Sequence, residues 1–376
     1  MPAKTTSAHE GCLPLAIDLF CGAGGLTRGL WEGGFSVVCC VDVDRWAIQT
    51  QAANHPQALL RRTDICQLTG EDLLGAAGVR AGELDLLAGG PPCKGFSQSN
   101  RRTRSLDNPK NLLYLHFLRL VAEIRPKWFL MENVWGLEHV EHGYARDDIL
   151  RRAASLGYEV SFRVLNAANY GVPQVRRRIF FVGNREGRVF RFPRMLFTDP
   201  RRFRTVRNAI ADLPELSNGH SNDECKYRLA WARASAYQRR MRGSSRKRCV
   251  TSNVVTRNSE LVLARYRHIP SGGNWENIPA ELMSNYADRS RCHTGIYRRL
   301  EWDVPCVVLA NYRKNMLIHP RQDRGLSVRE AARLQSFPDD FVFKGPLGTQ
   351  QQQVADAVPP LLALAIAKAV RTQMGY

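Results

Sequence analysis

The sequence lacks any long hydrophobic run. No stretch of its 376 residues approaches 18 consecutive apolar residues, which is about the length that a membrane-spanning helix needs. The opening residues, MPAKTTSAHEGC, have one lysine and no apolar core, so they do not resemble a secretion signal. We therefore expect a cytoplasmic protein with no membrane partner and with a short disordered leader up to about Gly11.

The sequence also lacks a C-x-x-C pair. Its ten cysteines are scattered, which argues against a zinc site. A disulfide framework is not expected in a chain of this size without a secretion signal. The sequence therefore predicts reduced thiols and no bound metal.

Acidic residues are too few to balance the basic ones. The chain has 54 Lys and Arg against 35 Asp and Glu, a formal net charge of +19. Residues 191–320 hold 24 Lys and Arg and 11 Asp and Glu, so they contribute 24 − 11 = +13 of that charge. Such a basic segment suits a polyanion, with nucleic acid as the first candidate. A solvated basic surface explains the charge equally well.

The first 190 residues alternate apolar runs with amphipathic stretches, which predicts a mostly parallel α/β sheet covered on both faces. In such sheets ligands bind at the carboxyl ends of the strands. Helices are expected over residues 45–54, 111–124 and 145–156. Strands are expected at residues 15–20, 35–42, 84–90, 127–134, 158–165 and 177–183.

The pattern changes at about residue 188, where periodicity becomes weak. It returns near Gly325. Ser327 and Glu330 then have the spacing of a capping box for a helix that continues through Leu334. The apolar run LLALAIAKAV after Pro360 predicts a last helix packed on the first domain. We predict a catalytic domain of residues 11–187 and 325–376, and an inserted domain of residues 188–324.

A glycine-rich turn, Asp18-Leu-Phe-Cys-Gly-Ala-Gly-Gly25, follows the first predicted strand. Glycines let the backbone turn tightly and approach a ligand. The dinucleotide fingerprint G-x-G-x-x-G would need glycine at position 27, where this chain has Thr27. A nicotinamide oxidoreductase is therefore disfavoured, although a purely structural turn remains an alternative.

Acidic residues follow the next two strand-like segments. Asp42 is placed to accept hydrogen bonds from ribose hydroxyls, and Asp64 can reach an adenine amino group. A single such residue is often only a helix cap. Together with the glycine turn, however, the two aspartates suit an adenosyl ligand.

The segment Gly89-Gly-Pro-Pro-Cys-Lys-Gly-Phe-Ser97 ends another predicted strand. A structural cysteine is normally buried among apolar neighbours, whereas Cys93 follows two stiff prolines in a loop. That placement suits a nucleophile with an accessible thiolate.

Glu132 follows a buried-looking strand, and Gln174-Val-Arg-Arg-Arg178 opens another. The carboxyl group can bond a base ring nitrogen, or donate a proton if its pKa is raised. On a strand, Arg176 and Arg178 share one face, and they can hold a pyrimidine carbonyl, a phosphate or Glu132. Ordinary salt bridges remain an equal alternative for these residues.

Taken together, these segments resemble the C5-cytosine DNA methyltransferase family. The blocks F-C-G-A-G-G, P-P-C, E-N-V, Q-x-R-x-R, R-E-A-A-R-L-Q-S-F-P and V-x-x-A-V-P-P occur in the family's order between residues 18 and 360. The resemblance implies a Rossmann-like S-adenosylmethionine-dependent domain with a smaller inserted target-recognition domain.

The resemblance also implies roles for individual residues. Cys93 attacks carbon 6 of a cytosine flipped out of double-stranded DNA, Glu132 bonds ring nitrogen 3 in protonated form, Arg178 orients the base and Arg176 supports the site. The residues expected to bind S-adenosylmethionine are Phe20, Gly22, Gly24, Gly25, Asp42, Val43, Asp64, Ile65, Pro92, Leu112, Asp356 and Val358. The loop Lys94–Leu106 is expected to close over the base, with arginines available for phosphates.

The sequence departs from the family pattern at two positions. Asp356 replaces the usual Asn of G-N-A-V-P-P, and we expect its charge to repel the carboxylate of the cofactor. Lys94 replaces the usual Gln after the nucleophile, with less consequence.

The expected function is a prokaryotic, nucleoid-associated DNA (cytosine-5-)-methyltransferase that acts as a monomer, either in a restriction-modification system or as an orphan. Two alternatives remain open. One is a transfer-RNA cytosine-5 methyltransferase, and the other is a DNA-binding regulator with a decayed cofactor site.

Overall fold

The computed structural model describes residues 13–92, 112–138, 143–286, 294–314 and 316–376. The predicted leader and the loop Lys94–Leu106 lie outside these ranges, and so does Cys93.

A seven-stranded sheet forms the centre of the larger part of the molecule, with strand order β3-β2-β1-β4-β5-β7-β6. The five strands from β3 to β5 are mutually parallel, whereas β7 runs antiparallel to both β5 and β6. The predicted mostly parallel sheet is thus confirmed. The strands are β1 (Leu15–Leu19), β2 (Ser36–Asp42), β3 (Leu59–Arg62), β4 (Leu86–Gly89), β5 (Trp128–Val134), β6 (Glu159–Asn166) and β7 (Arg177–Asn184).

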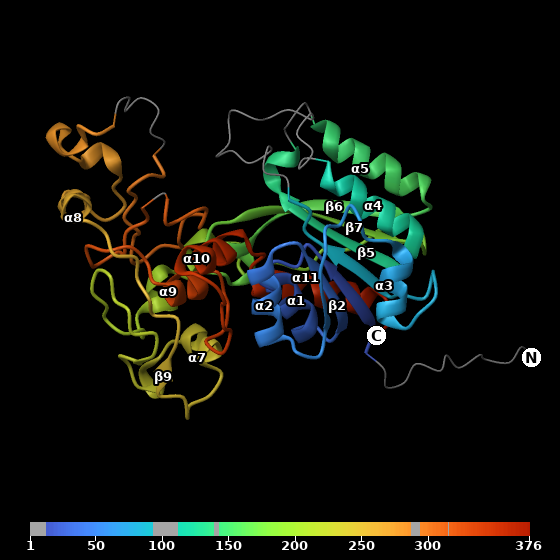
Figure 1. The fold of residues 1–376 in the computed structure, drawn as a ribbon, viewed down its shortest axis with the longest axis horizontal. Coiled ribbons are helices and arrows are strands. Elements are labelled where there is room, and N and C mark those ends of the chain that lie inside the picture. Colours follow the sequence, from blue (N-terminus) through green and yellow to red (C-terminus); the bar gives the residue numbers. More distant parts are fainter. Residues whose placement is uncertain (1–12, 93–111, 139–142, 287–293, 315) are drawn as a thin grey trace, which may run out of the picture.

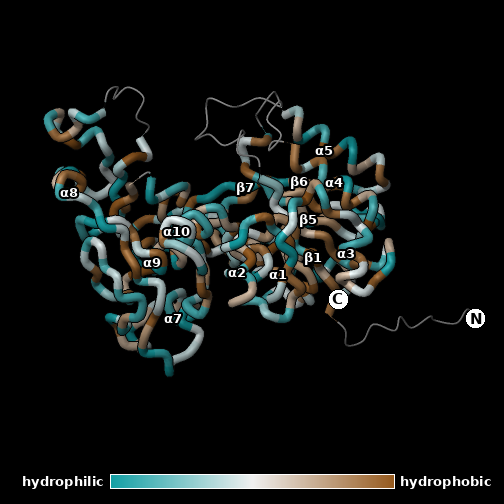
Figure 2. The backbone as a smooth tube through the Cα atoms, in the orientation of Figure 1, coloured by the Kyte–Doolittle hydropathy of each residue, from teal (hydrophilic) through white to brown (hydrophobic). Residues whose placement is uncertain are grey.

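Helices cover both faces of the sheet, because successive strand residues point to opposite sides. On β1, Ala16 packs in the cluster with α1 and α11, whereas Ile17 and Leu19 pack in the cluster with α3, α4 and α5. Figure 1 shows these two helix layers, and the strands between them are largely brown in Figure 2. The helices are α1 (Gly25–Glu32), α2 (Arg45–Asn54), α3 (Gly70–Ala77), α4 (Leu113–Ile124), α5 (Tyr144–Ser155) and α11 (Pro360–Gln373).

The last helix packs on the first domain, as the sequence predicts, and there it lies against α1. Glycines at every fourth position of α1 and its C-cap let α11 approach closely: Gly25, Gly29 and Gly33. A Cβ on Gly29 would lie 2.3 Å from the Cβ of Ala363, and one on Gly33 would lie 2.6 Å from the Cβ of Ala367. At Gly25 the same atom would lie 2.1 Å from the Val358 carbonyl oxygen. These contacts leave no room for side chains, and they bring the segment before α11 against the glycine turn.

We call residues 185–327, between β7 and α9, the second lobe. Figure 1 shows it beside the sheet, with α9 and α10 between the two parts. Its helices and strands, followed by α9 and α10, are α6 (Val206–Ile210), β8 (Cys225–Lys226), α7 (Ala236–Arg242), β9 (Cys249–Val250), α8 (Glu260–Arg267), α9 (Val328–Leu334) and α10 (Leu347–Asp356). Short 3₁₀ turns are η3 (Trp135–Glu138), η5 (Ala167–Tyr170), η6 (Pro200–Arg202), η7 (Trp231–Arg233), η8 (Trp275–Asn277) and η9 (Ala280–Met283).

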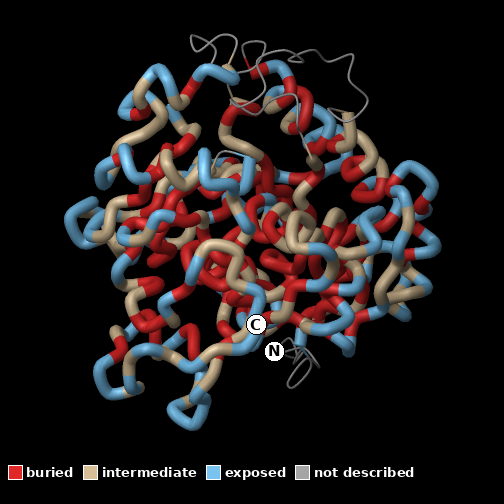
Figure 3. The backbone as a smooth tube through the Cα atoms, turned by 60° about the vertical axis from the view of Figure 1, so that its left-hand side comes forward, coloured by how far each residue is buried: buried red, intermediate tan, exposed pale blue. Residues whose placement is uncertain are grey.

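The second lobe shares its main core with the sheet. Tyr237, Met241 and Leu300 belong to the same buried cluster as α9 and α11, and buried backbone runs continuously through the middle of the molecule in Figure 3. A smaller cluster around Tyr266 and Tyr297 lies within the lobe itself. The assignment of residues 188–324 to a separate recognition domain stays a prediction.

Helix α9 joins the two parts through buried ion pairs. Its predicted capping box is confirmed, since the Ser327 hydroxyl accepts from Glu330 N–H and the Glu330 carboxylate accepts from Ser327 N–H. Arg333 is fully buried and contacts Asp339 at 2.5 Å and Asp212 of the second lobe at 3.1 Å.

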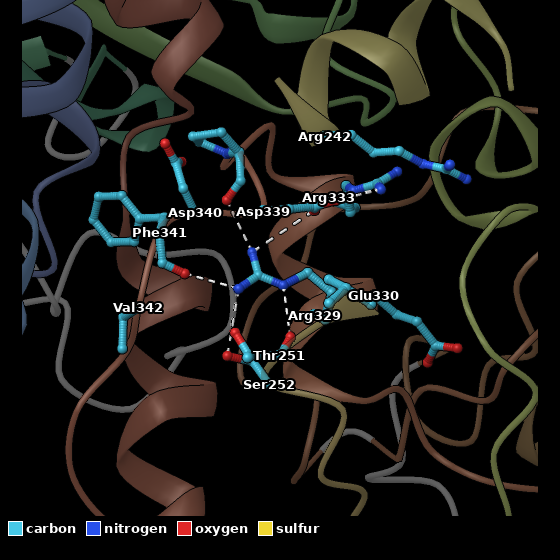
Figure 4. A network of polar contacts seen from close by, with 12 residues as sticks. Arg242, Thr251, Ser252, Arg329, Glu330, Arg333, Asp339, Asp340, Phe341 and Val342 are labelled. Carbon is cyan, nitrogen blue, oxygen red and sulfur yellow. Dashed lines mark hydrogen bonds and ion pairs between the residues drawn. The ribbon is translucent and has the colours of Figure 1, made fainter. Parts of the chain in front are cut away.

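A second arginine of α9 binds mainly backbone carbonyls, beside a longer ion-pair contact of 3.9 Å with Asp339. Arg329 donates to the carbonyls of Thr251, Pro338 and Phe341 at 2.8–2.9 Å (Figure 4). Because buried polar groups are costly unless they are paired, these contacts fix the second lobe against α9.

In the described ranges, no single helix is long and apolar enough to cross a membrane, although the bent pair α10 and α11 reaches the required length and composition together.

Candidate active site

Four parallel strands end side by side at one edge of the sheet. Leu19 pairs with both Val41 and Gly89, and Gly89 pairs with Met131. The residues that follow β1, β2, β4 and β5 therefore meet at this edge, where ligands bind in parallel sheets. The sequence predicted this convergence.

The turn after β1 is built from left-handed backbone conformations. Phe20, Gly22 and Gly24 have φ values of 55°, 51° and 96°, which glycine adopts far more readily than phenylalanine does. The Gly22 N–H donates to Asp42 Oδ2 at 2.8 Å. A Cβ placed on Gly22 would meet no atom within 4 Å, so the turn faces open space there.

Asp42 at the end of β2 lies against this turn. Its other carboxylate oxygen accepts from the Asp44 N–H at 2.8 Å. Burial raises the pKa of Asp42, and the two backbone hydrogen bonds oppose the shift. The next side chain, Val43, is 64% exposed, so an apolar surface is left open to solvent beside the carboxylate.

Asp64 follows β3 by two residues and is exposed. Its carboxylate accepts from the Cys66 N–H at 2.9 Å, which lowers the pKa of Asp64. The adjacent Ile65 is buried. Asp64 thus caps the local backbone, which is the structural alternative named above. Its carboxylate is nevertheless accessible to a ligand.

Glu132 near the end of β5 is buried, and its Oε1 lies 2.9 Å from Arg178 Nε. Burial raises the pKa of Glu132, against the opposing effects of Arg178 and Arg176. A Cβ on Gly90 would lie 3.1 Å from Glu132 Oε2, so the glycine lets the β4 edge approach the carboxyl group. The site therefore favours a carboxyl that can carry a proton.

The two predicted arginines have different environments. β7 begins at Arg177, so the strand that was expected to include Arg176 starts one residue after it. Arg176 is 1% exposed and donates to the carbonyls of Ala355 and Ala357 at 2.9 and 3.1 Å. Arg178 pairs with Glu132. Arg176 thus holds the end of α10, and Arg178 reaches the carboxyl group.

Asn133 was not singled out from the sequence, yet it connects two of the predicted segments. Its buried side-chain amide donates to the Pro91 carbonyl at 3.1 Å. This contact ties the proline pair to β5, directly before Cys93. The only sequence signal was its place beside Glu132 in the E-N-V block.

The remaining predicted residues lie around the same edge. Pro92 is half-buried, and Leu112 is half-buried at the start of α4. Asp356 is exposed at the end of α10 and accepts from Gln352 Nε2 at 2.7 Å. Val358 is buried, with its carbonyl over Gly25.

No three His, Cys, Asp or Glu side chains are grouped to hold a metal ion in the part of the chain that the structure describes.

Comparison with known proteins adds independent findings. Residues 15–372 match the model of a family described as C-5 cytosine-specific DNA methylase. Type II methyltransferase M1.HphI of Haemophilus parahaemolyticus is 36% identical over 362 residues, which cover 96% of this chain and 87% of the relative. Type II methyltransferase M.DdeI of Desulfomicrobium norvegicum is 32% identical over 375 residues, covering 94% and 88%.

The fold is also similar to that of a crystal structure from E. coli, described as a DNA modification methyltransferase encoded within a prophage. The TM-score is 0.75 at 27% identity, and the match covers 96% of this chain and 100% of the other.

Proposed function

The chain belongs to the C-5 cytosine-specific DNA methylase family, enzymes that use S-adenosylmethionine as methyl donor, and we propose that it methylates carbon 5 of a cytosine flipped out of double-stranded DNA. The observation that carries this proposal is the buried Glu132–Arg178 pair. It lies at the strand edge that also bears the glycine turn and the proline pair held by Asn133.

The residues present fit an adenosyl ligand. Gly22 faces open space, the Asp42 carboxylate lies beside it, and the adjacent Val43 leaves apolar surface exposed. We assign the ribose hydroxyls to Asp42, the adenine ring to Phe20 and Val43, and the adenine amino group to Asp64. The donor supplies an electrophilic methyl group when it is bound.

Carbon 5 of cytosine is a weak nucleophile, and it does not attack a methyl donor unaided. In the proposed reaction the Cys93 thiolate adds to carbon 6, and the electron pair of the carbon 5–carbon 6 double bond makes carbon 5 the nucleophile. Carbon 5 would then take the methyl group, and the electrons of the methyl–sulfur bond would stay on the sulfur of the donor, which leaves as a thioether. A base then removes the proton from carbon 5, and the cysteine leaves with the electrons of its bond to carbon 6.

Glu132 assists the addition if it holds a proton toward ring nitrogen 3, because that proton neutralises charge that develops on the ring. The raised pKa of Glu132 supports this role. Arg178 holds the carboxyl group and orients the base, and Arg176 supports the site from the end of α10.

DNA is the proposed partner because the second lobe carries most of the excess positive charge. The names of the type II relatives suggest a modification enzyme of a bacterial restriction-modification system. A target base cannot be reached inside the duplex, so it has to be flipped out.

The test is transfer of labelled methyl from S-adenosylmethionine to duplex DNA of mixed sequence, followed by base-resolution mapping of 5-methylcytosine. A signal confined to one short sequence is expected. Methylation of transfer RNA but not DNA would move the substrate to RNA. Absence of both, with no donor binding, would indicate a decayed cofactor site.

Cys93→Ser is expected to abolish transfer while DNA affinity is kept, because the hydroxyl is a far weaker nucleophile than the thiolate. Gel-shift titration and methyl incorporation measure the two properties separately. Unchanged turnover would refute the assignment of the nucleophile.

A further inference from the structure

We propose that Asn311, Gln352 and Asp356 form a directional hydrogen-bond relay. The relay holds a DNA-contacting turn of the second lobe, residues 311–314, in register with the active-site arginines Arg176 and Arg178. These three are positioning residues, and the inference rests on the proposed function because it concerns the same site.

The segment before the turn is anchored directly beside those arginines. Cys306 exchanges two backbone hydrogen bonds of 2.9 Å with the segment 173–175. The Leu309 N–H donates to Gln174 Oε1 at 3.1 Å, and its carbonyl accepts from Arg176 at 3.4 Å. The chain therefore leaves the active-site edge at a fixed point before it enters the turn.

The turn presents two cations to solvent. Arg313 and Lys314 are exposed, and the Lys314 N–H donates to Asn311 Oδ1 at 3.0 Å, which closes the turn. Exposed cations at a fixed distance from a catalytic site suit DNA phosphates, which set the register of a protein on the duplex.

The relay runs from this turn to the end of α10. Asn311 Nδ2 donates to Gln352 Oε1 at 2.8 Å, and Gln352 Nε2 donates to Asp356 Oδ1 at 2.7 Å. An ionised carboxylate only accepts hydrogen bonds. Asp356 therefore fixes which end of the Gln352 amide faces it, and the oxygen that remains requires a donor at position 311.

The end of α10 is in turn held by the active site. Arg176 donates to the carbonyls of Ala355 and Ala357. The charge of Asp356 also acts on both active-site arginines, since it opposes the lowering of their pKa values by burial. A shift of the turn is thereby transmitted to Arg176 and to its neighbour Arg178.

The decisive variant is Asn311→Asp. The new carboxylate keeps the acceptor for the Lys314 N–H but cannot donate to Gln352 Oε1. We expect kcat/KM for duplex DNA to fall about tenfold, which is the order of effect for one lost polar contact that leaves an acceptor unpaired. The dissociation constant for S-adenosylmethionine should stay within about twofold of the parent value.

The relay predicts a specific rescue by Asp356→Asn. In the double variant the Gln352 amide turns over, donates to the carboxylate at position 311 and accepts from the new amide at position 356. Recovery of kcat/KM to within about threefold of the Asp356→Asn single variant is expected, because that variant carries the same change at position 356. A double variant about tenfold slower than Asp356→Asn would overturn the relay.

Gln352→Met provides a second route, because it removes both hydrogen bonds without adding charge. Adding N311D to it should cause no further loss in kcat/KM, since no relay remains to be broken. Full additivity of the two effects would count against the proposal.

Asn222→Asp is the matched control, because it places the same charge on an exposed position of the second lobe outside the relay. It should leave kcat/KM unchanged, and a tenfold loss there would assign the N311D effect to charge alone. Parent protein that transfers no methyl group to DNA would overturn the proposed function as well, whereas active parent with no rescue overturns the relay alone.

Discussion

Gly29→Ala tests the close packing of α1 on α11, which brings Val358 to the glycine turn. Two effects compete in this substitution. Alanine is favoured over glycine inside a helix by about 1 kcal/mol. Against this, the new Cβ would lie 2.3 Å from the Ala363 Cβ and 2.7 Å from the Ala363 carbonyl carbon, whereas carbon atoms pack at about 3.5–4.0 Å.

The steric effect should dominate, because one of the two contacts is with backbone that cannot rotate away. Overpacking a tight core typically costs about 1–3 kcal/mol. Relief requires α11 to move as a unit, and α11 is buried on all sides around Ala363, from Pro360 to Leu364. We expect a net loss of up to about 2 kcal/mol in the free energy of unfolding, with weaker S-adenosylmethionine binding because Val358 moves with the helix.

Gly75→Ala in α3 is the matched control, since a Cβ there meets no atom within 4 Å. It should gain about 0.5–1 kcal/mol from helix propensity. Urea titrations of both variants and of the parent, followed by far-UV circular dichroism, measure the difference. If G29A proved as stable as G75A, the packing argument would be refuted.

Two further predictions follow from the buried charges. Glu132→Gln should slow single-turnover methylation strongly while donor binding is retained. In the parent the rate should fall as pH rises through the raised pKa of Glu132, because the carboxyl proton is present only below that pKa. This fall should be absent in the variant, because its amide does not titrate. A pH profile that both proteins share would contradict the role. Arg333→Met should destabilise the fold by about 3 kcal/mol, since it removes the cation shared by two buried carboxylates and leaves Asp212 with Arg242 and Asp339 with Tyr227; a urea midpoint equal to that of the parent would exclude this.

Much of the sheet was predictable because its strands are apolar runs bounded by turn residues. The expected ranges for β1, β2 and β5 agree with the structure to within a residue or so at each end. α1 was missed because glycine-rich sequence ordinarily ends helices. The structure shows that these glycines are packing positions against α11, a contact between residues more than 300 apart that local periodicity cannot reveal.

The site was predicted as a set of strand-end residues, but the contacts between them were not. Parallel strands place Asp42 and Glu132 at one edge, and that follows from topology. The bond from Asn133 to Pro91 depends on the separation of β4 and β5. Similarly, the α9 network pairs Arg333 with a carboxylate of the second lobe, where the sequence showed only weak periodicity.

The charge of Asp356 acquires a different meaning once its surroundings are known. From the sequence alone it was expected to repel the carboxylate of the donor, and that effect stays a prediction. In the structure its carboxylate accepts from Gln352 and acts on the charges of Arg176 and Arg178. When Glu132 is ionised, the charges of the two arginines and of the carboxylates of Glu132 and Asp356 sum to zero.

When Glu132 takes up the proton that the proposed chemistry requires, the same group carries a charge of +1. With a neutral residue at position 356 it would carry +2 around two guanidinium groups that are already costly to bury. Asp356 therefore lowers the electrostatic cost of the protonated state of Glu132. A negative charge at the rim of the site thus supports the proposed chemistry through the arginines, even where it opposes binding of the donor.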